Sequence, residues 1–290
     1  MRVLILGGDG MLGHRLLQEF APHHETRVTL RQPLNSYRRF GMFNAGNAYD
    51  RVDVLDPSRV LKVFADFKPQ AAINAVGIVK QRADVRDEVR SLEVNAIFPH
   101  LVARLCREHG GRLVHLSTDC VFSGKKGNYT EKDRPDPEDL YGLSKLLGEA
   151  DGPGALTLRT SMIGPELQRK TGLVEWFLSQ KGKSVKGWRK AIFSGLTTAE
   201  LARVIENLVT KHPAACGVYH VSGEPISKLE LLTRLDIRLR TGTVIAADDA
   251  FKCDRSLDSA RFRAAFGYLP PDWDTMLDEL AADIMMKGSG

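Results

Sequence analysis

The chain has 290 residues, 43% of them hydrophobic and 27% charged, which is ordinary for a globular protein of one large domain or two smaller ones. Its 41 Lys and Arg residues against 36 Asp and Glu give a formal net charge of +5, and no five like charges follow one another. This distribution argues against a nucleic-acid-binding surface, while a mild positive field suits a diphosphate ligand. No apolar stretch approaches the roughly 20 residues of a membrane span, so no membrane partner is expected.

The four cysteines, Cys106, Cys120, Cys216 and Cys253, have no C-x-x-C spacing. Neither a metal site nor a disulfide framework is therefore indicated, and reduced thiols in a cytoplasmic protein are the simpler interpretation. The chain starts at once with a strand-like run that leads into glycines, so we expect no signal peptide.

The first half alternates short apolar strands with amphipathic helices. In chain order we expect a strand at 1–6, a helix at 11–20, a strand at 27–30, a loop at 32–48, a strand at 51–54, a helix at 58–67, a strand at 71–76, a helix at 85–108, a strand at 113–117, a helix at 141–149 and a strand at 155–159. This rhythm is typical of a Rossmann-type α/β fold, with a doubly wound parallel sheet covered by helices on both faces.

After Ser161 the pattern loosens. We expect helices at 173–180, 198–211, 228–240 and 275–286, and short strands at 217–221 and 243–245. The sequence therefore predicts a Rossmann domain over 1–161 and a smaller mixed α/β substrate-binding region over 162–286. The chain is expected to return to the large sheet once, near 217–222.

A glycine motif, Gly8-x-Gly10-x-x-Gly13, follows the first strand and opens the first helix. Glycines there allow a tight turn and close approach of the backbone to a pyrophosphate, and the N-terminus of the helix offers free N–H groups. The motif predicts a dinucleotide site; the alternative is a glycine-rich turn without a ligand. The residues expected to contact the cofactor here are Gly7, Gly10, Met11, Leu12 and Gly13.

The end of the second strand distinguishes NAD from NADP, because an acid there binds the ribose hydroxyl and an arginine accepts the 2′-phosphate. Arg31 follows this strand and favours NADP, with Arg38 and Arg39 as further candidates, unless all three are solvated surface arginines. Asp53 and Val54 fall where an adenine contact is expected.

Small residues end the fourth strand, where a cofactor can lie against the backbone. They are Asn74, Ala75, Val76 and Gly77, and the alternative is a plain turn after a strand.

Two polar blocks supply candidate chemistry. Ser117, Thr118 and Asp119 end the fifth strand, and Tyr141 and Lys145 stand four residues apart on a predicted helix, hence on one face. A cation about 4 Å from a phenol lowers the phenol pKa by up to roughly three units, which makes a tyrosine a usable acid or base. The alternatives are an exposed helical pair and hydroxyls that cap the end of a strand.

Several motifs occur in a fixed order: Gly7-Gly-x-Gly10-x-x-Gly13, Asn74-Ala-x-Gly77, Ser117-Thr-Asp-Cys-Val-Phe-Ser-Gly124, Tyr141-x-x-x-Lys145, Leu158-Arg-Thr-Ser161, Phe193-Ser-Gly-Leu-Thr-Thr198 and Gly217-Val-Tyr-His-Val-Ser222. Together they resemble the extended short-chain dehydrogenase/reductases over residues 1 to about 280. The most similar branch is the dTDP-4-dehydrorhamnose reductase type of sugar-nucleotide reductase.

The resemblance implies a catalytic set of Thr118, Tyr141 and Lys145. Tyr141 would protonate the sugar carbonyl oxygen as hydride arrives from the nicotinamide, Lys145 would hold the nicotinamide ribose, and Thr118 would hydrogen-bond the reacting oxygen. Ser117 would lie against the cofactor. The implied cofactor is NADPH, with NADH as a second choice, and the implied partners are a nucleotide-sugar and a second copy of the chain.

Substrate contacts are expected from Thr118, Asp119 and Cys120. The related 4,6-dehydratases carry a glutamate at the position of Cys120, so dehydration is disfavoured. Trp188 and Arg189 are expected to meet the nucleotide, with Arg159, Lys186 and Lys190 as further cations for its diphosphate; a solvated basic loop is the alternative for this stretch.

The sequence thus favours NADPH-dependent reduction of a nucleotide-linked 4-keto-6-deoxysugar. Two alternatives stay open. One is an epimerase of the same superfamily, which would keep NAD bound. The other is a non-catalytic NADP-binding regulatory subunit of another enzyme.

Overall fold

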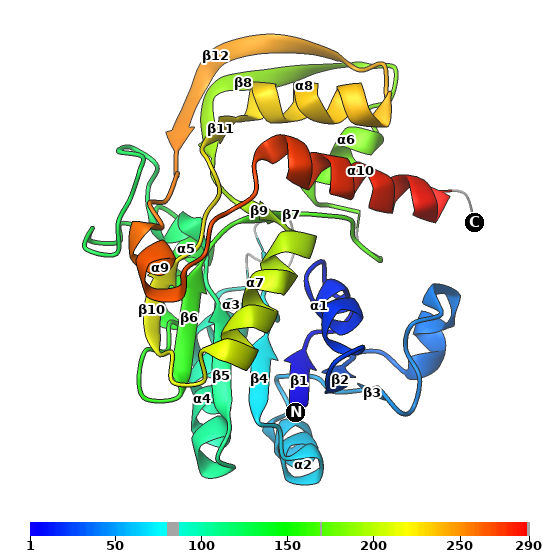
Figure 1. Ribbon diagram of the computed structural model, residues 1–290, viewed down its shortest axis with the longest axis vertical. Helices are drawn as coiled ribbons and strands as arrows, with labels where there is room; N and C mark the ends of the chain where they lie inside the picture. Colours follow the sequence, from blue (N-terminus) through cyan, green and yellow to red (C-terminus); the bar gives the residue numbers. More distant parts are fainter. Residues whose placement is uncertain (80–86, 169, 289–290) are drawn as a thin grey trace.

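The computed structural model of the protein describes residues 1–79, 87–168 and 170–288. Its larger lobe is built on a seven-stranded sheet in the order β10-β6-β5-β4-β1-β2-β3 (Figure 1), and every neighbouring pair is parallel. The strands are β1 (Arg2–Leu6), β2 (Glu25–Thr29), β3 (Ala48–Tyr49), β4 (Ala71–Asn74), β5 (Arg112–Leu116), β6 (Ala155–Arg159) and β10 (Gly217–His220). The Rossmann-type sheet and the return strand are confirmed.

Helices cover both faces of this sheet, because successive strand residues point to opposite sides. Val3 and Ile5 of β1 face α1 (Gly13–Phe20) and α7 (Thr198–Lys211), whereas Leu4 and Leu6 face α2 (Pro57–Phe67) and α4 (Phe98–Glu108). All four side chains are fully buried. Burying such a side chain contributes about 1.5–3 kcal/mol to stability, so the sheet is held by one hydrophobic cluster on each of its faces.

The expected long helix over 85–108 is broken into three parts. Its expected first residues lie outside the described residues, and the structure shows α3 (Glu88–Leu92), a π-helical turn η3 (Glu93–Ile97) and α4. Pro99 has no N–H for the carbonyl of Asn95, and Gly148 approaches that carbonyl so closely that a Cβ would lie 2.0 Å from its oxygen. The wide turn brings the Asn95 side chain inward.

Two further expectations around the second strand were wrong. The strand expected at 51–54 forms instead at Ala48–Tyr49, where Val28 and Thr29 pair with Ala48 and Tyr49. The expected loop at 32–48 contains a 3-10 helix, η1 (Leu34–Phe40). The buried Tyr37 on η1 donates to Asp9 of the glycine turn at 2.9 Å, so this segment packs against the dinucleotide motif.

The smaller lobe carries a mixed three-stranded sheet in the order β11-β8-β12, with α8 (Lys228–Leu239) packed on it (Figure 1). Its strands are β8 (Ser184–Phe193), β11 (Ile226–Ser227) and β12 (Val244–Asp254). β12 runs parallel to β8 and β11 runs antiparallel. The sequence did not predict β8, and it predicted only the first residues of β12. The remaining elements are β7 (Met162–Ile163), β9 (Leu196–Thr197), α5 (Leu140–Leu147), the 3-10 turn η4 (Asp119–Val121), α6 (Leu173–Leu178), α9 (Ala260–Phe266) and α10 (Trp273–Gly288).

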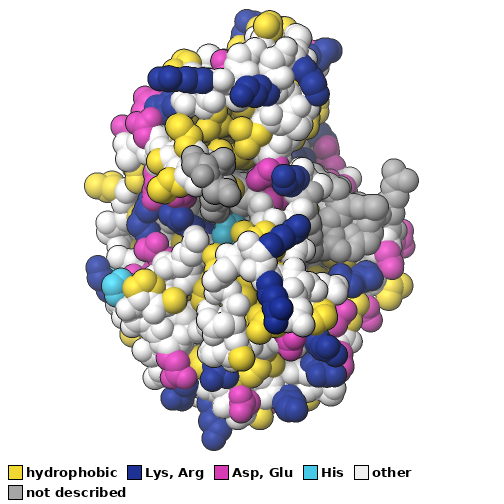
Figure 2. Space-filling view, turned by 90° about the vertical axis from the view of Figure 1, so that its right-hand side faces the viewer, with side chains coloured by type: hydrophobic (Ala, Val, Ile, Leu, Met, Phe, Trp, Pro, Cys, Tyr) yellow, Lys and Arg dark blue, Asp and Glu magenta, His cyan; other side chains and the backbone are white. Residues whose placement is uncertain are grey.

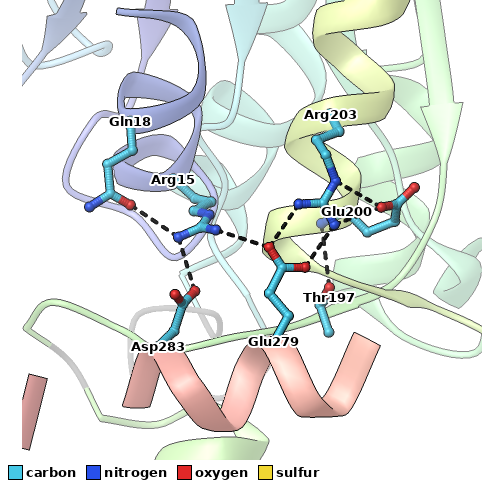
Figure 3. Close-up of polar contacts among 7 residues, drawn as sticks. All are labelled: Arg15, Gln18, Thr197, Glu200, Arg203, Glu279 and Asp283. Atoms are coloured by element: carbon cyan, nitrogen blue, oxygen red, sulfur yellow. Dashed lines mark hydrogen bonds and ion pairs between the residues drawn. The ribbon is translucent and has the colours of Figure 1, made fainter. Parts of the chain in front are cut away.

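The last helix, α10, joins the two lobes. It packs against α8 of the smaller lobe, and its acidic side chains pair with arginines of α1 and α7 (Figure 3). Glu279 lies 2.7 Å from Arg203, and Asp283 lies 2.9 Å from Arg15. Because α1 follows the glycine turn directly, these ion pairs tie the C-terminal helix to the dinucleotide motif.

The distribution of surface charge and the state of the cysteines can be compared with what the composition predicted. On the face shown in Figure 2, Lys and Arg side chains are spread among Asp and Glu and do not form one continuous patch. All four cysteines are free thiols. Within the ranges that the structure describes, no helix combines the length and the apolar character needed to cross a bilayer.

Candidate active site

The glycine turn has the geometry that the motif requires. Gly7 has φ +86°, a Cβ on Gly13 would lie 2.0 Å from the carbonyl oxygen of Gly7, and a Cβ on Gly8 would lie 2.5 Å from Val28. Only glycine therefore allows β1, the turn and α1 to approach this closely. The N-terminus of α1 is left facing the carboxyl end of the sheet.

A narrow cleft of about 100 Å³ lies beside this turn. Its lining includes Arg31, Asp53 and Val54, which the sequence predicted, and Asp9 and Arg90, which it did not. The Arg31 Nε lies 3.5 Å from a carboxylate oxygen of Asp53, and both side chains are nearly half exposed. The cleft therefore has both a guanidinium, which could bind a ribose 2′-phosphate, and a carboxylate, which could bind a ribose 2′-hydroxyl.

Arg90 of α3 gives an independent sign of a ligand at this cleft. Its Nε is buried and has no hydrogen-bond partner among the described residues. A buried donor without a partner is costly, which fits a missing acceptor such as a phosphate or ribose oxygen. The glycine turn, Arg31 and Arg90 thus fit a dinucleotide cofactor.

A larger cavity of about 340 Å³ continues from the glycine turn toward the smaller lobe. The structure brings together here most of the residues predicted from the sequence; those in its lining are Gly10, Met11, Leu12, Ala75, Val76, Gly77, Ser117, Thr118, Asp119, Cys120, Tyr141 and Lys145. The opposite wall supplies Glu166, Phe193 and Lys228, none of which was predicted as a site residue. Asn74 lies just behind the wall and is fully buried.

Tyr141 enters the cavity from the first turn of α5, whose N-cap Asp139 accepts a hydrogen bond from Gly142 at 2.8 Å. Burial raises the pKa of the Tyr141 phenol, and a hydrogen bond with Thr118 opposes this rise only in part. The pKa of Tyr141 is thus raised on balance, and the expectation of a phenol pKa lowered toward neutral was wrong. Burial thus favours the neutral phenol of Tyr141, which is the form of a general acid.

Lys145 is nearly fully buried and points away from solvent. Its Nζ donates to the carbonyl oxygen of Leu116 at 2.5 Å and lies 3.4 Å from Nε2 of His115. Burial lowers the pKa of Lys145 to about 8, and the nearby Glu149 opposes that shift. With its pKa at about 8, Lys145 is still largely an ammonium at neutral pH, and it loses its charge just above that pH.

Behind the cavity, Glu149 and Arg159 form a buried ion pair. The Arg159 Nε and Nη2 donate to the two carboxylate oxygens at 2.8 and 2.7 Å, and the Ser117 hydroxyl donates to the same carboxylate at 2.7 Å. Arg159, expected at a substrate diphosphate, is thus already paired inside the protein, and that expectation was wrong. The pair fixes Ser117 at the end of β5.

Asn95, on the π-helical turn, holds the segment that follows β4. Its amide exchanges hydrogen bonds with the backbone of Ile78 at 2.9 and 3.0 Å and donates to Ser144 at 3.1 Å. It thereby joins the segment after β4 to the helix that carries Tyr141 and Lys145.

Trp188 and Arg189 are not brought to the cavity. Trp188 lies on β8 and is 39% exposed, and its ring is 4.7 Å from that of Phe251. Arg189 pairs with Asp249 at 2.8 Å. Lys228, at the start of α8, is instead the cation that the smaller lobe places in the cavity wall; its Nζ lies 4.2 Å from the centre of the Phe193 ring.

No group of three or more His, Cys, Asp and Glu side chains suited to a metal ion is present among the residues described.

A glycine turn that opens a Rossmann helix, with Tyr141 and Lys145 over the adjoining cavity, is the arrangement of an extended short-chain dehydrogenase/reductase. Over residues 1–286 the chain matches the family described as RmlD substrate binding domain, and it belongs to that family.

Individual relatives carry different names. The chain is 30% identical to the probable dTDP-4,6-dihydroxy-2-methyloxan-3-one 4-ketoreductase of Streptomyces antibioticus, over 77% of this chain and 71% of that protein. It is 28% identical to the methionine adenosyltransferase 2 subunit beta of Bos taurus, over 79% and 70%. The crystal structure of dTDP-4-dehydrorhamnose reductase from Bacillus anthracis in complex with NADP superimposes with a TM-score of 0.80 at 22% identity, covering 97% of this chain and 99% of that one.

Proposed function

We propose that the protein is an NADPH-dependent oxidoreductase that reduces the keto group of a nucleotide-linked 4-keto-6-deoxysugar, as dTDP-4-dehydrorhamnose reductases do. The observation that carries this proposal is the meeting of Thr118, Tyr141 and Lys145 in one cavity that continues from the glycine turn. The family supports it, because its relatives include ketoreductases of nucleotide-linked sugars.

The protonated state of Tyr141 sets the direction of the proposed chemistry. The cofactor, when bound, supplies a hydride to the carbonyl carbon. Tyr141 gives its hydroxyl proton to the carbonyl oxygen, and Thr118, hydrogen-bonded to Tyr141, steadies the phenol and the same oxygen. Reduction begins from a phenol, whereas the oxidation half of an epimerase cycle begins from a phenolate. The reductases among the relatives favour the reductase over the epimerase.

NADPH is the proposed cofactor, with NADH as a weaker second. Arg31 can pair with a 2′-phosphate, and Arg90 offers a buried Nε that has no partner among the described residues in the same cleft. Asp53, beside Arg31, can accept a hydrogen bond from a ribose hydroxyl, which leaves NADH some affinity.

The substrate is proposed to lie between the two lobes. Thr118, Asp119 and Cys120 line its path from the sheet, and Lys228 faces them from α8. We propose the region 162–286, apart from the return strand, as the substrate-binding part. Trp188 and Arg189 stay predictions for the nucleotide end.

A homodimer is also proposed. Val89, Ile97, Leu143 and Leu147 are exposed apolar side chains on α3, η3 and α5, which pack together on one side of the larger lobe. Apolar side chains grouped on neighbouring helices are suited to a second copy of the chain. We propose a cytoplasmic location on the ground of the four free thiols.

The function is tested by mixing the purified protein with NADPH and dTDP-4-dehydrorhamnose and following loss of NADPH absorbance. We expect turnover with the sugar nucleotide and none with the nucleotide alone. Tight binding of NADPH without turnover on any nucleotide-linked keto sugar would instead favour a regulatory subunit. Tightly bound NAD in the isolated protein would favour the epimerase.

A further inference from the structure

A buried imidazole lies directly behind Lys145, on the side away from Tyr141. We propose that Asn74 and His115 are positioning residues for Lys145, and that His115 donates a hydrogen bond to the lysine Nζ and thereby sets the pH range in which that lysine carries its charge. The inference concerns Lys145 in the protein itself and does not require that the proposed substrate be correct.

The orientation of the Asn74 amide is fixed by the backbone. The N–H of Val76 lies 3.1 Å from the Asn74 side chain, and because a backbone N–H can only donate, the atom it meets is Oδ1. The amide NH₂ of Asn74 therefore faces the other way, where Nδ1 of His115 lies 3.2 Å from it.

This orientation determines the tautomer of His115. An NH₂ group can only donate, so Nδ1 of His115 is the acceptor. His115 is fully buried, and burial together with the charge of Lys145 holds its pKa well below the ordinary value, so the ring is neutral. A neutral imidazole whose Nδ1 accepts carries its proton on Nε2.

The Nε2–H of His115 points at Nζ of Lys145, 3.4 Å away. An ammonium has no lone pair to accept this hydrogen bond, whereas a neutral amine has one. The carbonyl oxygen of Leu116 accepts from Nζ in either state. The contact with His115 therefore favours the neutral amine.

The other groups around Lys145 also affect the balance between its charged and neutral forms. Glu149, one turn further along α5, favours the ammonium, and Tyr141 on the same helix is a neutral phenol. Among the described residues of β5, His115 is the titratable group that faces Nζ. His100 of α4 in turn acts on His115 through its charge. Burial lowers the pKa of Lys145 to about 8 against the effect of Glu149, and in this proposal the His115 donor acts in the same direction as burial.

The consequence is a charge near Tyr141 that changes close to neutral pH. Below the pKa of Lys145 the ammonium stabilises the phenolate that remains when Tyr141 has given up its proton; above it this help is lost. His115 thus fixes where the basic side of the activity profile begins.

The tautomer is tested in the wild-type protein by ¹⁵N NMR of labelled histidines, with His115→Asn used to assign the signal. We expect a neutral ring that carries its proton on Nε2 from pH 6 to 9. A proton on Nδ1, or a charged ring in this range, would overturn the proposal.

The effect on Lys145 is tested without added cofactor, by measuring with mass spectrometry how the acetylation rate of each lysine depends on pH. In His115→Asn the shorter amide still meets Asn74 but no longer reaches Nζ. Removal of one hydrogen bond to the neutral amine should raise the midpoint of Lys145 from about 8 by up to roughly one pH unit.

Lys228 is the internal control. Its pKa is also lowered to about 8 by burial, and it lies across the same cavity without contact to His115, so its midpoint should not move. If His115→Asn is folded and the Lys145 midpoint stays in place, His115 is only a packing residue and the proposal fails. If the variant does not fold, the wild-type tautomer decides. Neither result depends on NADPH oxidation, so failure of the proposed function is recognised separately.

Discussion

The two lobes that enclose the cavity differ in the kind of element that supplies their lining residues. The larger lobe contributes residues at the carboxyl ends of adjacent parallel strands, from the Gly7 turn after β1 to Thr118 after β5. The smaller lobe contributes single side chains from separate elements, such as Phe193 at the end of β8 and Lys228 at the start of α8. A site at strand ends follows from topology, whereas the opposite wall depends on how distant segments pack.

The largest effect is expected where the larger lobe supplies the proton. Tyr141→Phe keeps the ring and removes the acid, so kcat should fall by roughly 10²–10⁴-fold, with NADPH affinity nearly unchanged. Steady-state kinetics and cofactor titration of the two proteins measure both quantities. Retention of more than about a tenth of kcat would remove Tyr141 from this role.

The next largest effect is expected from a substitution in the glycine turn, which tests whether the backbone geometry of this turn is needed for cofactor binding. In Gly13→Ala the new Cβ would meet the Gly7 carbonyl oxygen at 2.0 Å, so the turn must shift. We expect a loss of about 1–3 kcal/mol in stability and weaker NADPH binding. Thermal unfolding and calorimetric titration check this.

Gly152→Ala is the matched control, because a Cβ there meets nothing within 4 Å. It should leave both quantities unchanged. Equal behaviour of the two variants would show that the turn tolerates a side chain.

The preference for NADPH over NADH tests a single side chain of the larger lobe, Arg31. A charge-assisted pair between Arg31 and a 2′-phosphate is worth about 1.5–3 kcal/mol, or roughly 10- to 100-fold in affinity. Arg31→Ala should remove most of the preference for NADPH and leave NADH binding alone. Titration of the wild type and of Arg31→Ala with NADPH and with NADH measures these affinities. If the wild type binds both cofactors equally well, Arg31 has no role in cofactor choice.

The smaller lobe should affect the substrate and not the cofactor. Lys228→Met keeps the apolar stem against Phe193 and removes the charge, so KM for the sugar nucleotide should rise by roughly 10-fold while NADPH affinity is kept. Lys211→Met, at an exposed lysine of α7 outside the cavity, is the control. An unchanged KM in Lys228→Met would exclude this lysine from substrate binding.

The difference between the lobes also explains what the sequence could predict. The strand, turn and helix around Gly7–Gly13 are local, and Tyr141 and Lys145 lie on one helical face at a fixed spacing, so pattern alone was enough. Strand β8 has no clear alternation that distinguishes it from a basic loop, and Trp188 and Arg189 were therefore expected at the substrate.

Partners inside the larger lobe were harder to predict. The wide turn at Glu93–Ile97 depends on Pro99 and on the distant Gly148. Glu149 and Arg159 pair only because the segment after α5 packs against the end of β6. His115 looked like one more residue of a buried strand, and its contact with Lys145 appears only when the strand and α5 are packed together.

The most direct test of the account is transfer of deuterium from NADPH labelled at nicotinamide C4 to dTDP-4-dehydrorhamnose. The C4 label must be placed on each face of the ring in turn. We predict that one of the two cofactors gives a reduced sugar nucleotide with one deuterium on C4, as seen by mass spectrometry, and that Tyr141→Phe gives almost none. Binding of NADPH with no deuterium in the sugar from either cofactor would contradict hydride transfer and, with it, the assignment of this protein as a reductase.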